Sequence, residues 1–126
     1  ICLEVFEYLS APQRAVSEIY RVLKKDGILI LSTPFMYRLH RDQMRFSKDY
    51  LEKELFASFS QVKIYPVGNF YTIILDILRG KIQNIKSTFL RYLGYLPYLF
   101  LVLFIPLSKI SKDENYVSGY FIRAQK

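Results

Sequence analysis

Two carboxylates near the start of the sequence, Glu4 and Glu7, are three residues apart. Carboxylates at this spacing can hold a hard metal ion, or one of them can act as a general base. The alternative is structural: Glu7 caps or pairs with a neighbouring group, and Glu4 hydrogen-bonds the backbone at the end of a strand. The spacing alone favours the structural alternative, so no metal site is predicted.

The sole histidine, His40, lies in a segment that also holds Arg38, Arg41 and Arg45. An imidazole can serve as a general base, and guanidinium groups bind phosphate or carboxylate oxygens in pairs. A solvated basic loop with an exposed histidine accounts for the same residues. The sequence shows no neighbouring Cys or Ser motif and no Gly-rich phosphate loop, so no nucleophilic triad is predicted.

Residues 1–35 are predicted to position these groups as a strand, a helix and a second strand. Ser10 and Pro12 are typical of a helix start, and Gly27 is predicted to provide the left-handed exit. One face of the helix is apolar, and it carries Val16, Ile19, Tyr20 and Leu23.

The apolar run at residues 28–31 lacks alternation, which predicts a strand buried on both faces of a parallel sheet. A parallel β-α-β unit implies a right-handed crossover. The loops at residues 7–10 and 35–46 follow the two strands, so both are expected at the ligand-binding edge of the sheet.

Further along, Ser47 is predicted to cap a helix over about residues 48–58, and a strand is predicted at 61–67. Asn69 is a plausible cap for a helical segment in which Gly80 ends the first helix. A last strand is expected over 116–125, with Gly119 as a possible bulge.

The 126 residues carry a formal net charge of +7, and 52% of them are hydrophobic. This composition predicts one folded domain, and the charge favours anionic partners, although a solvated basic surface explains it as well. Nucleic acid is not expected, because the aromatic residues are at core spacing. With one cysteine, no disulfide can form within the chain, and a cytoplasmic location is expected.

Residues 92–108 form a run of 17 residues without a charge, interrupted by Pro97 and Pro106. Tyrosines at its start and lysines after its end favour contact of residues 69–108 with a membrane surface, as helices that lie on the membrane or as a re-entrant dip. A soluble lid or dimer surface is the second possibility. A spanning helix is the third, since about 17 residues is a lower limit for a span.

The motifs EVFEYL and PQRAVSEIYRVLKKDGILILSTPF, followed by HRDQMRFSKDYLEKEL, resemble class I S-adenosylmethionine-dependent methyltransferases. The resemblance covers residues 1–68 and, loosely, the last strand; residues 69–115 correspond to a helical hydrophobic insertion. It implies an α/β fold, in which residues 1–126 are the C-terminal part of a Rossmann-like sheet. Because the chain begins with Ile1 inside a predicted strand, we expect it to be part of a longer protein.

The resemblance also implies where S-adenosyl-L-methionine would bind. It places Cys2, Leu3 and Glu4 against the cofactor, and it places the family's Gly-rich loop and ribose-binding acid before Ile1. We therefore expect residues 1–126 alone to be inactive. Tyr8 stands where the family has a histidine, which argues against the metal site found in some relatives.

The implied activity is methyl transfer to a small-molecule or lipid-linked acceptor. Glu7 and His40 are the candidate catalytic bases, and Tyr8, Phe35 and Arg45 are the expected substrate contacts. The alternative is a non-enzymatic basic module that binds membrane surfaces. Either function suits a cytoplasmic protein that is peripheral on the membrane.

Overall fold

The structure is a computed structural model that describes residues 1–36, 41–108 and 116–126. The described residues form two compact units. We call residues 1–35, 41–67 and 119–126 the sheet unit, and residues 36, 68–108 and 116–118 the helical unit. The segment predicted to be helical, 69–108, thus makes up most of a unit of its own.

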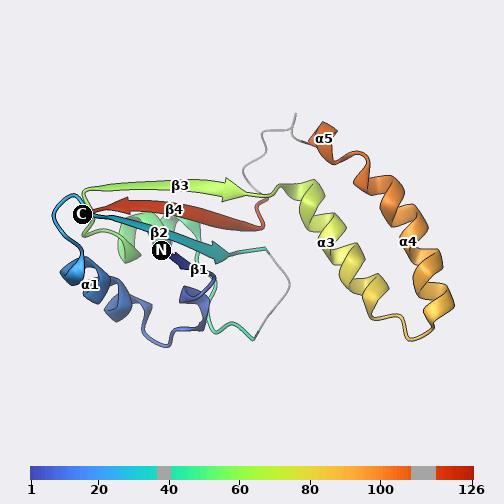
Figure 1. The fold of residues 1–126 in the computed structure, drawn as a ribbon, viewed down its shortest axis with the longest axis horizontal. Coiled ribbons are helices and arrows are strands. Elements are labelled where there is room, and N and C mark those ends of the chain that lie inside the picture. Colours follow the sequence, from blue (N-terminus) through green and yellow to red (C-terminus); the bar gives the residue numbers. More distant parts are fainter. Residues whose placement is uncertain (37–40, 109–115) are drawn as a thin grey trace. The chain divides into compact units, whose positions relative to one another are not determined.

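The sheet unit contains a four-stranded mixed sheet in the order β1-β2-β4-β3 (Figure 1). Its strands are β1 (Cys2–Leu3), β2 (Ile28–Pro34), β3 (Gln61–Val67) and β4 (Gly119–Gln125). Strands β1 and β2 are parallel, whereas β4 is antiparallel to both β2 and β3. This mixed α/β architecture is compatible with a Rossmann-like fold, and it confirms the predicted β-α-β unit and the pairing of the last two strands.

The connection from β1 to β2 contains the short 3₁₀ helix η1 (Phe6–Tyr8) and the helix α1 (Pro12–Val22). Pro12 occupies the first turn as predicted, where its missing N–H costs little. The prediction of Ser10 as the cap is wrong. Ala11 precedes the helix, and no side chain caps it.

The turn after α1 also differs from the prediction. Asp26, with φ 62°, adopts the left-handed conformation that was expected of Gly27. The Gly27 N–H donates to the Lys24 carbonyl at 2.9 Å, and a Cβ on Gly27 would lie 2.8 Å from that oxygen. Gly27 is therefore required for close approach of the backbone and not for its φ angle.

Gly119 begins β4 in regular register, opposite Pro34 on β2 and Val67 on β3. The predicted bulge at this position is therefore wrong. A Cβ on Gly119 would lie only 2.6 Å from the Thr33 carbonyl oxygen. The backbone of β2 therefore leaves no room for a side chain at this position.

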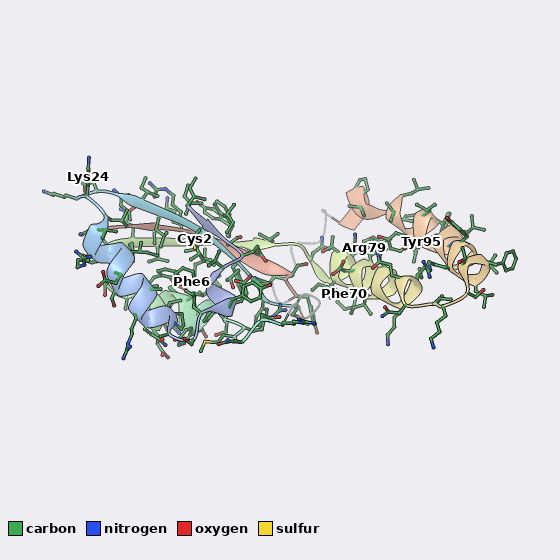
Figure 2. The ribbon with its side chains drawn as sticks, turned by 60° about the horizontal axis from the view of Figure 1, so that its bottom comes forward. Cys2, Phe6, Lys24, Phe70, Arg79 and Tyr95 are labelled. Carbon is green, nitrogen blue, oxygen red and sulfur yellow. The ribbon has the colours of Figure 1, made fainter. Side chains whose placement is uncertain are left out.

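The core of the sheet unit lies on one face of the sheet. Leu29 and Leu31 of β2 and Ile122 and Ala124 of β4 are buried there beneath the helices. On the other face the side chains are exposed or half-buried, and no described helix of the sheet unit covers them (Figure 2). The prediction that residues 28–31 are buried on both faces is thus wrong for the described part of the chain.

The helix predicted over 48–58 is shorter and changes form. It begins as α2 (Lys48–Tyr50) and continues as the wider π-helical turn η2 (Leu51–Leu55). The cap is confirmed, because the Tyr50 N–H donates to Ser47 Oγ at 3.3 Å. Leu51, Leu55 and the residue after the turn, Phe56, supply the helical side of the core.

The helical unit contains α3 (Phe70–Gln83), α4 (Thr88–Val102) and the short α5 (Ile105–Ser108). Asn69 caps α3 through a reciprocal capping box with Thr72, as its position predicted. Gly80 does not end α3, which continues to Gln83. None of the described helices is long and apolar enough to cross a membrane.

Candidate functional site

The carboxyl ends of β1 and β2 bring together the residues expected to touch the cofactor. Cys2 lies opposite Leu31 and is half-buried, and burial raises the pKa of its thiol. Leu3 lies opposite Ser32 on the uncovered face, with 51% of its surface exposed. These neighbours therefore present a thiol to one face of the sheet and an apolar side chain to the other.

Glu4 turns the chain at the end of β1. It has a left-handed backbone with φ 53°, and its N–H donates to the Ser32 carbonyl at 3.1 Å. The Ser32 hydroxyl donates to Glu4 Oε1 at 3.0 Å. Glu4 thus ties the ends of the two parallel strands together, although its carboxylate accepts from the Ser32 side chain and not, as the structural alternative expected, from the backbone.

Glu7 lies in η1 and is almost fully buried, with 1% of its surface exposed. Burial raises the pKa of its carboxyl group, and the negative charges of Glu4 and Asp42 raise it further. The Glu7 backbone N–H and the Arg45 guanidinium act in the opposite direction. The net direction is upward, so Glu7 holds its proton to a higher pH than an exposed glutamate does.

The Glu7 backbone connects the two loops that were expected at one edge of the sheet. Its carbonyl oxygen accepts hydrogen bonds from the Gln43 N–H at 2.7 Å and from the Met44 N–H at 3.1 Å. The chain after β2 is therefore attached directly to the chain after β1. This contact confirms that the loops lie at the same edge.

Arg45 joins the end of β2 to this edge. Its Nη1 donates to the Phe35 carbonyl at 2.9 Å, and its Nε pairs with the Asp42 carboxylate. The Asp42 side chain is almost fully buried. Sequence analysis missed Asp42, because the segment that holds it is not helical and its spacing from Arg45 carries no signal of an ion pair.

The remaining predicted site residues differ in exposure, and one of them is not described. Tyr8 is exposed, whereas Phe35 is half-buried and packs against Tyr120 with ring centroids 5.6 Å apart. His40 lies outside the described residues, as does Arg38. Among residues 1–36, 41–108 and 116–126, no group of three acidic, histidine or cysteine side chains could hold a metal ion.

Two buried polar atoms at this edge have no hydrogen-bond partner in the described part of the chain: Glu7 Oε2 and Thr33 Oγ1. A buried polar atom without a partner costs about 1–3 kcal/mol, so such atoms often mark functional positions. Thr33 was not predicted, because its place in an apolar strand resembles that of any small β-branched residue.

Residues 1–31 match the family model described as a methyltransferase domain. The match covers β1, η1, α1 and the start of β2, the elements that carry Leu3, Glu4 and Glu7. It confirms the resemblance that the sequence showed over this segment, and it supports methyl transfer as the general activity. No curated protein and no solved structure matches the chain.

The raised pKa of Glu7 predicts a pH dependence of stability. The folded protein binds this proton more tightly than the unfolded chain, whose glutamate has the ordinary pKa of 4.5. As pH rises above that value the unfolded chain loses its proton first, and the free energy of unfolding falls until the raised pKa is passed.

The variant Glu7→Gln stays neutral at every pH. Its free energy of unfolding relative to wild type is therefore expected to increase with pH above about 4.5 and then to level off. Urea unfolding across a pH series measures this difference. A difference that stays constant with pH would contradict the burial-raised pKa.

The helical unit contains a groove of its own, which sequence analysis did not predict. It has a volume of about 450 Å³, and its apolar lining residues are Met36 and, on α3, Ile73 and Ile77. Its polar lining residues are Asp76, Lys81 and Asn84. Because Gly80 also lines it, the missing side chain of that residue contributes to the open space.

Proposed function

We propose that this chain contributes part of the active site of an S-adenosylmethionine-dependent methyltransferase, the part at the carboxyl ends of β1 and β2. The observation that carries the proposal is the methyltransferase-domain match over residues 1–31. Within those residues, Leu3, Glu4 and Glu7 lie at or just after the carboxyl end of β1, which pairs in parallel with β2. In open α/β sheets, ligands bind at that end of the strands.

The residues at this edge suit the cofactor. The exposed Leu3 offers an apolar surface to an adenine ring, and the Glu4 carboxylate can accept hydrogen bonds from hydroxyl or amino groups. S-adenosylmethionine supplies a methyl group on a positively charged sulfur. The neighbouring carboxylates favour a cation at this position.

The acceptor would approach the loops after β1 and β2. Methylation of a hydroxyl or amino group releases a proton, which a carboxylate with a raised pKa is suited to accept. Glu7 is such a group, and we assign the proton to its Oε2, which has no partner in the described part of the chain. Tyr8, Phe35 and Arg45 would contact a small-molecule or lipid-linked acceptor.

The cofactor assignment is tested by the variant Leu3→Lys in the protein at full length, because the resemblance places the Gly-rich loop outside these residues. The variant loses one apolar contact and places a cation beside the sulfonium. It is therefore expected to bind S-adenosylmethionine about tenfold more weakly or worse. Calorimetric titration with S-adenosylmethionine measures this. Val22→Lys, at an exposed apolar position on α1, is the control and is expected to bind as wild type does.

The titration distinguishes a wrong contact at Leu3 from a wrong assignment of methyl transfer. Equal affinity of wild type and Leu3→Lys would show that the cofactor does not contact Leu3. Failure of the full-length protein to bind S-adenosylmethionine at all would contradict methyl transfer. That result would favour the alternative function, a basic membrane-surface module without enzymatic activity.

A further inference from the structure

Helix α4 carries a continuous stripe of exposed apolar side chains. The helices α3 and α4 lie side by side as a hairpin (Figure 1), and α4 contacts α3 through Gly94, which lies against Ile82, and through the Leu101 carbonyl, which accepts from the Tyr71 hydroxyl. The opposite side of α4 has no partner within the helical unit. It is formed by Phe89, Tyr92, Leu93, Leu96, Leu99, Phe100 and Leu103.

The spacing of these seven residues places them on a single face. They recur at intervals of three and four residues, which align along one side of an α-helix. All seven are exposed, and Leu96 at the centre of the stripe has 64% of its surface exposed. A contiguous exposed apolar surface of this kind marks an interaction site.

The charges around the stripe indicate what binds it. The helical unit holds one acid in its described part, Asp76, and that acid is paired with Arg79 at 3.2 Å. From residue 77 to residue 108 the charges are all positive. Lys86 is exposed in the loop that leads into α4, and Lys81 is exposed near the end of α3.

An apolar stripe beside exposed lysines fits the surface of an anionic membrane. Apolar side chains of such a helix enter the boundary between headgroups and acyl chains, while lysines pair with anionic headgroups. Tyr92 on the stripe and Tyr95 and Tyr98 beside it are residues favoured at that depth. A second copy of the chain fits less well, because it would bring another unit of the same positive charge.

We propose that α4 docks parallel to the surface of an anionic lipid bilayer, with its apolar stripe in the membrane and α3 on the water side. In Figure 2, α3 carries the labelled Arg79 and α4 the labelled Tyr95. The docking is independent of methyl transfer. It sharpens the expectation that residues 69–108 meet a membrane, because it assigns the contact to one face of one helix.

The test is flotation of the 126-residue chain with vesicles of phosphatidylcholine, with or without phosphatidylglycerol. Wild type is expected to float with the anionic vesicles. The double variant Leu96→Glu/Phe100→Glu is expected to bind them at least about tenfold less, because two large side chains no longer enter the apolar layer. Lys86→Gln, in the loop that leads into α4, is expected to cost about fivefold with anionic vesicles only.

Two control variants test whether the loss of flotation is specific to α4. Val22→Glu, on α1 of the sheet unit, changes a side chain as exposed as Leu96 (65% against 64%) and is expected to float as wild type does. Phe121→Glu changes the uncovered face of the sheet and is also expected to float. Circular dichroism establishes that each variant is folded.

Three results would overturn the proposal. The first is no flotation of wild type with anionic vesicles. The second is flotation that Phe121→Glu abolishes and the α4 variant retains, which would assign the contact to the sheet. The third is a wild-type dimer in lipid-free solution that the α4 variant dissociates while it still floats as wild type does, which would identify a second copy as the occupant.

Discussion

Replacing Gly119 by alanine is expected to lower the free energy of unfolding of the sheet unit by about 3 kcal/mol or more. The added Cβ would lie 2.6 Å from the Thr33 carbonyl oxygen and 3.2 Å from Pro34 Cα. Both atoms belong to the backbone of the neighbouring strand, so neither can rotate away as a side chain can. Relief requires that β4 move away from β2, which breaks hydrogen bonds at the carboxyl end of β2.

Urea unfolding followed by circular dichroism measures the loss, with Gly80→Ala as the matched control. Gly80 is inside α3, and a Cβ there meets nothing within 4 Å. Alanine at this position is expected to stabilise the helix by about 0.5–1 kcal/mol, because glycine is a poor helix former. A Gly119→Ala variant as stable as wild type would show that the two strands are less closely packed.

Replacing Phe6 by alanine is expected to cost about 3–5 kcal/mol, the usual loss for a large aromatic side chain in a core. Phe6 is 1% exposed and lies beneath the sheet (Figure 2), with its ring 6.5 Å from that of Phe56. It precedes Glu7 in η1, so the cavity would also loosen the helix that holds the buried carboxyl group.

Phe89→Ala is the matched control, since Phe89 is 75% exposed on α4 and its loss is expected to change stability by less than about 0.5 kcal/mol. The denaturation midpoint of each variant measures the effect. Equal midpoints for Phe6→Ala and wild type would mean that η1 does not pack on the core, and Glu7 would then not be buried.

The elements predicted correctly are those that depend on residues close to one another in the sequence. The strand at 61–67 has the predicted bounds, and the caps at Ser47 and Asn69 are confirmed, because a cap depends on a few neighbouring residues. The pairing of the last two strands required the family resemblance, since residues between them form a separate unit.

The wrong predictions concern glycines and burial, which depend on tertiary contacts. Gly27 and Gly119 are needed because other backbone atoms approach them, and no local pattern reports such an approach. The Ser10 cap was wrong by one position, which is ordinary for helix ends. Burial of both faces at residues 28–31 was predicted because apolar and polar residues do not alternate there. The described residues give no reason for this unbroken apolar run.

The candidate site was predicted in part. The placement of the two loops at one edge followed from parallel strands alone and is confirmed by the bonds to the Glu7 carbonyl. The burial of Glu7 and its link to Asp42 and Arg45 could not be predicted, because an acid in a loop has the same sequence pattern whether it is exposed or covered. The role of His40 stays a prediction.

Photochemical crosslinking of radiolabelled S-adenosylmethionine to the protein tests whether the cofactor lies at the carboxyl end of β1. Trypsin cuts after Arg14, so one peptide that ends at Arg14 contains Cys2, Leu3, Glu4 and Glu7. Label is expected in that peptide, and competition by unlabelled S-adenosylhomocysteine should remove it. Labelled protein without label in that peptide would contradict the placement of the cofactor at the carboxyl end of β1.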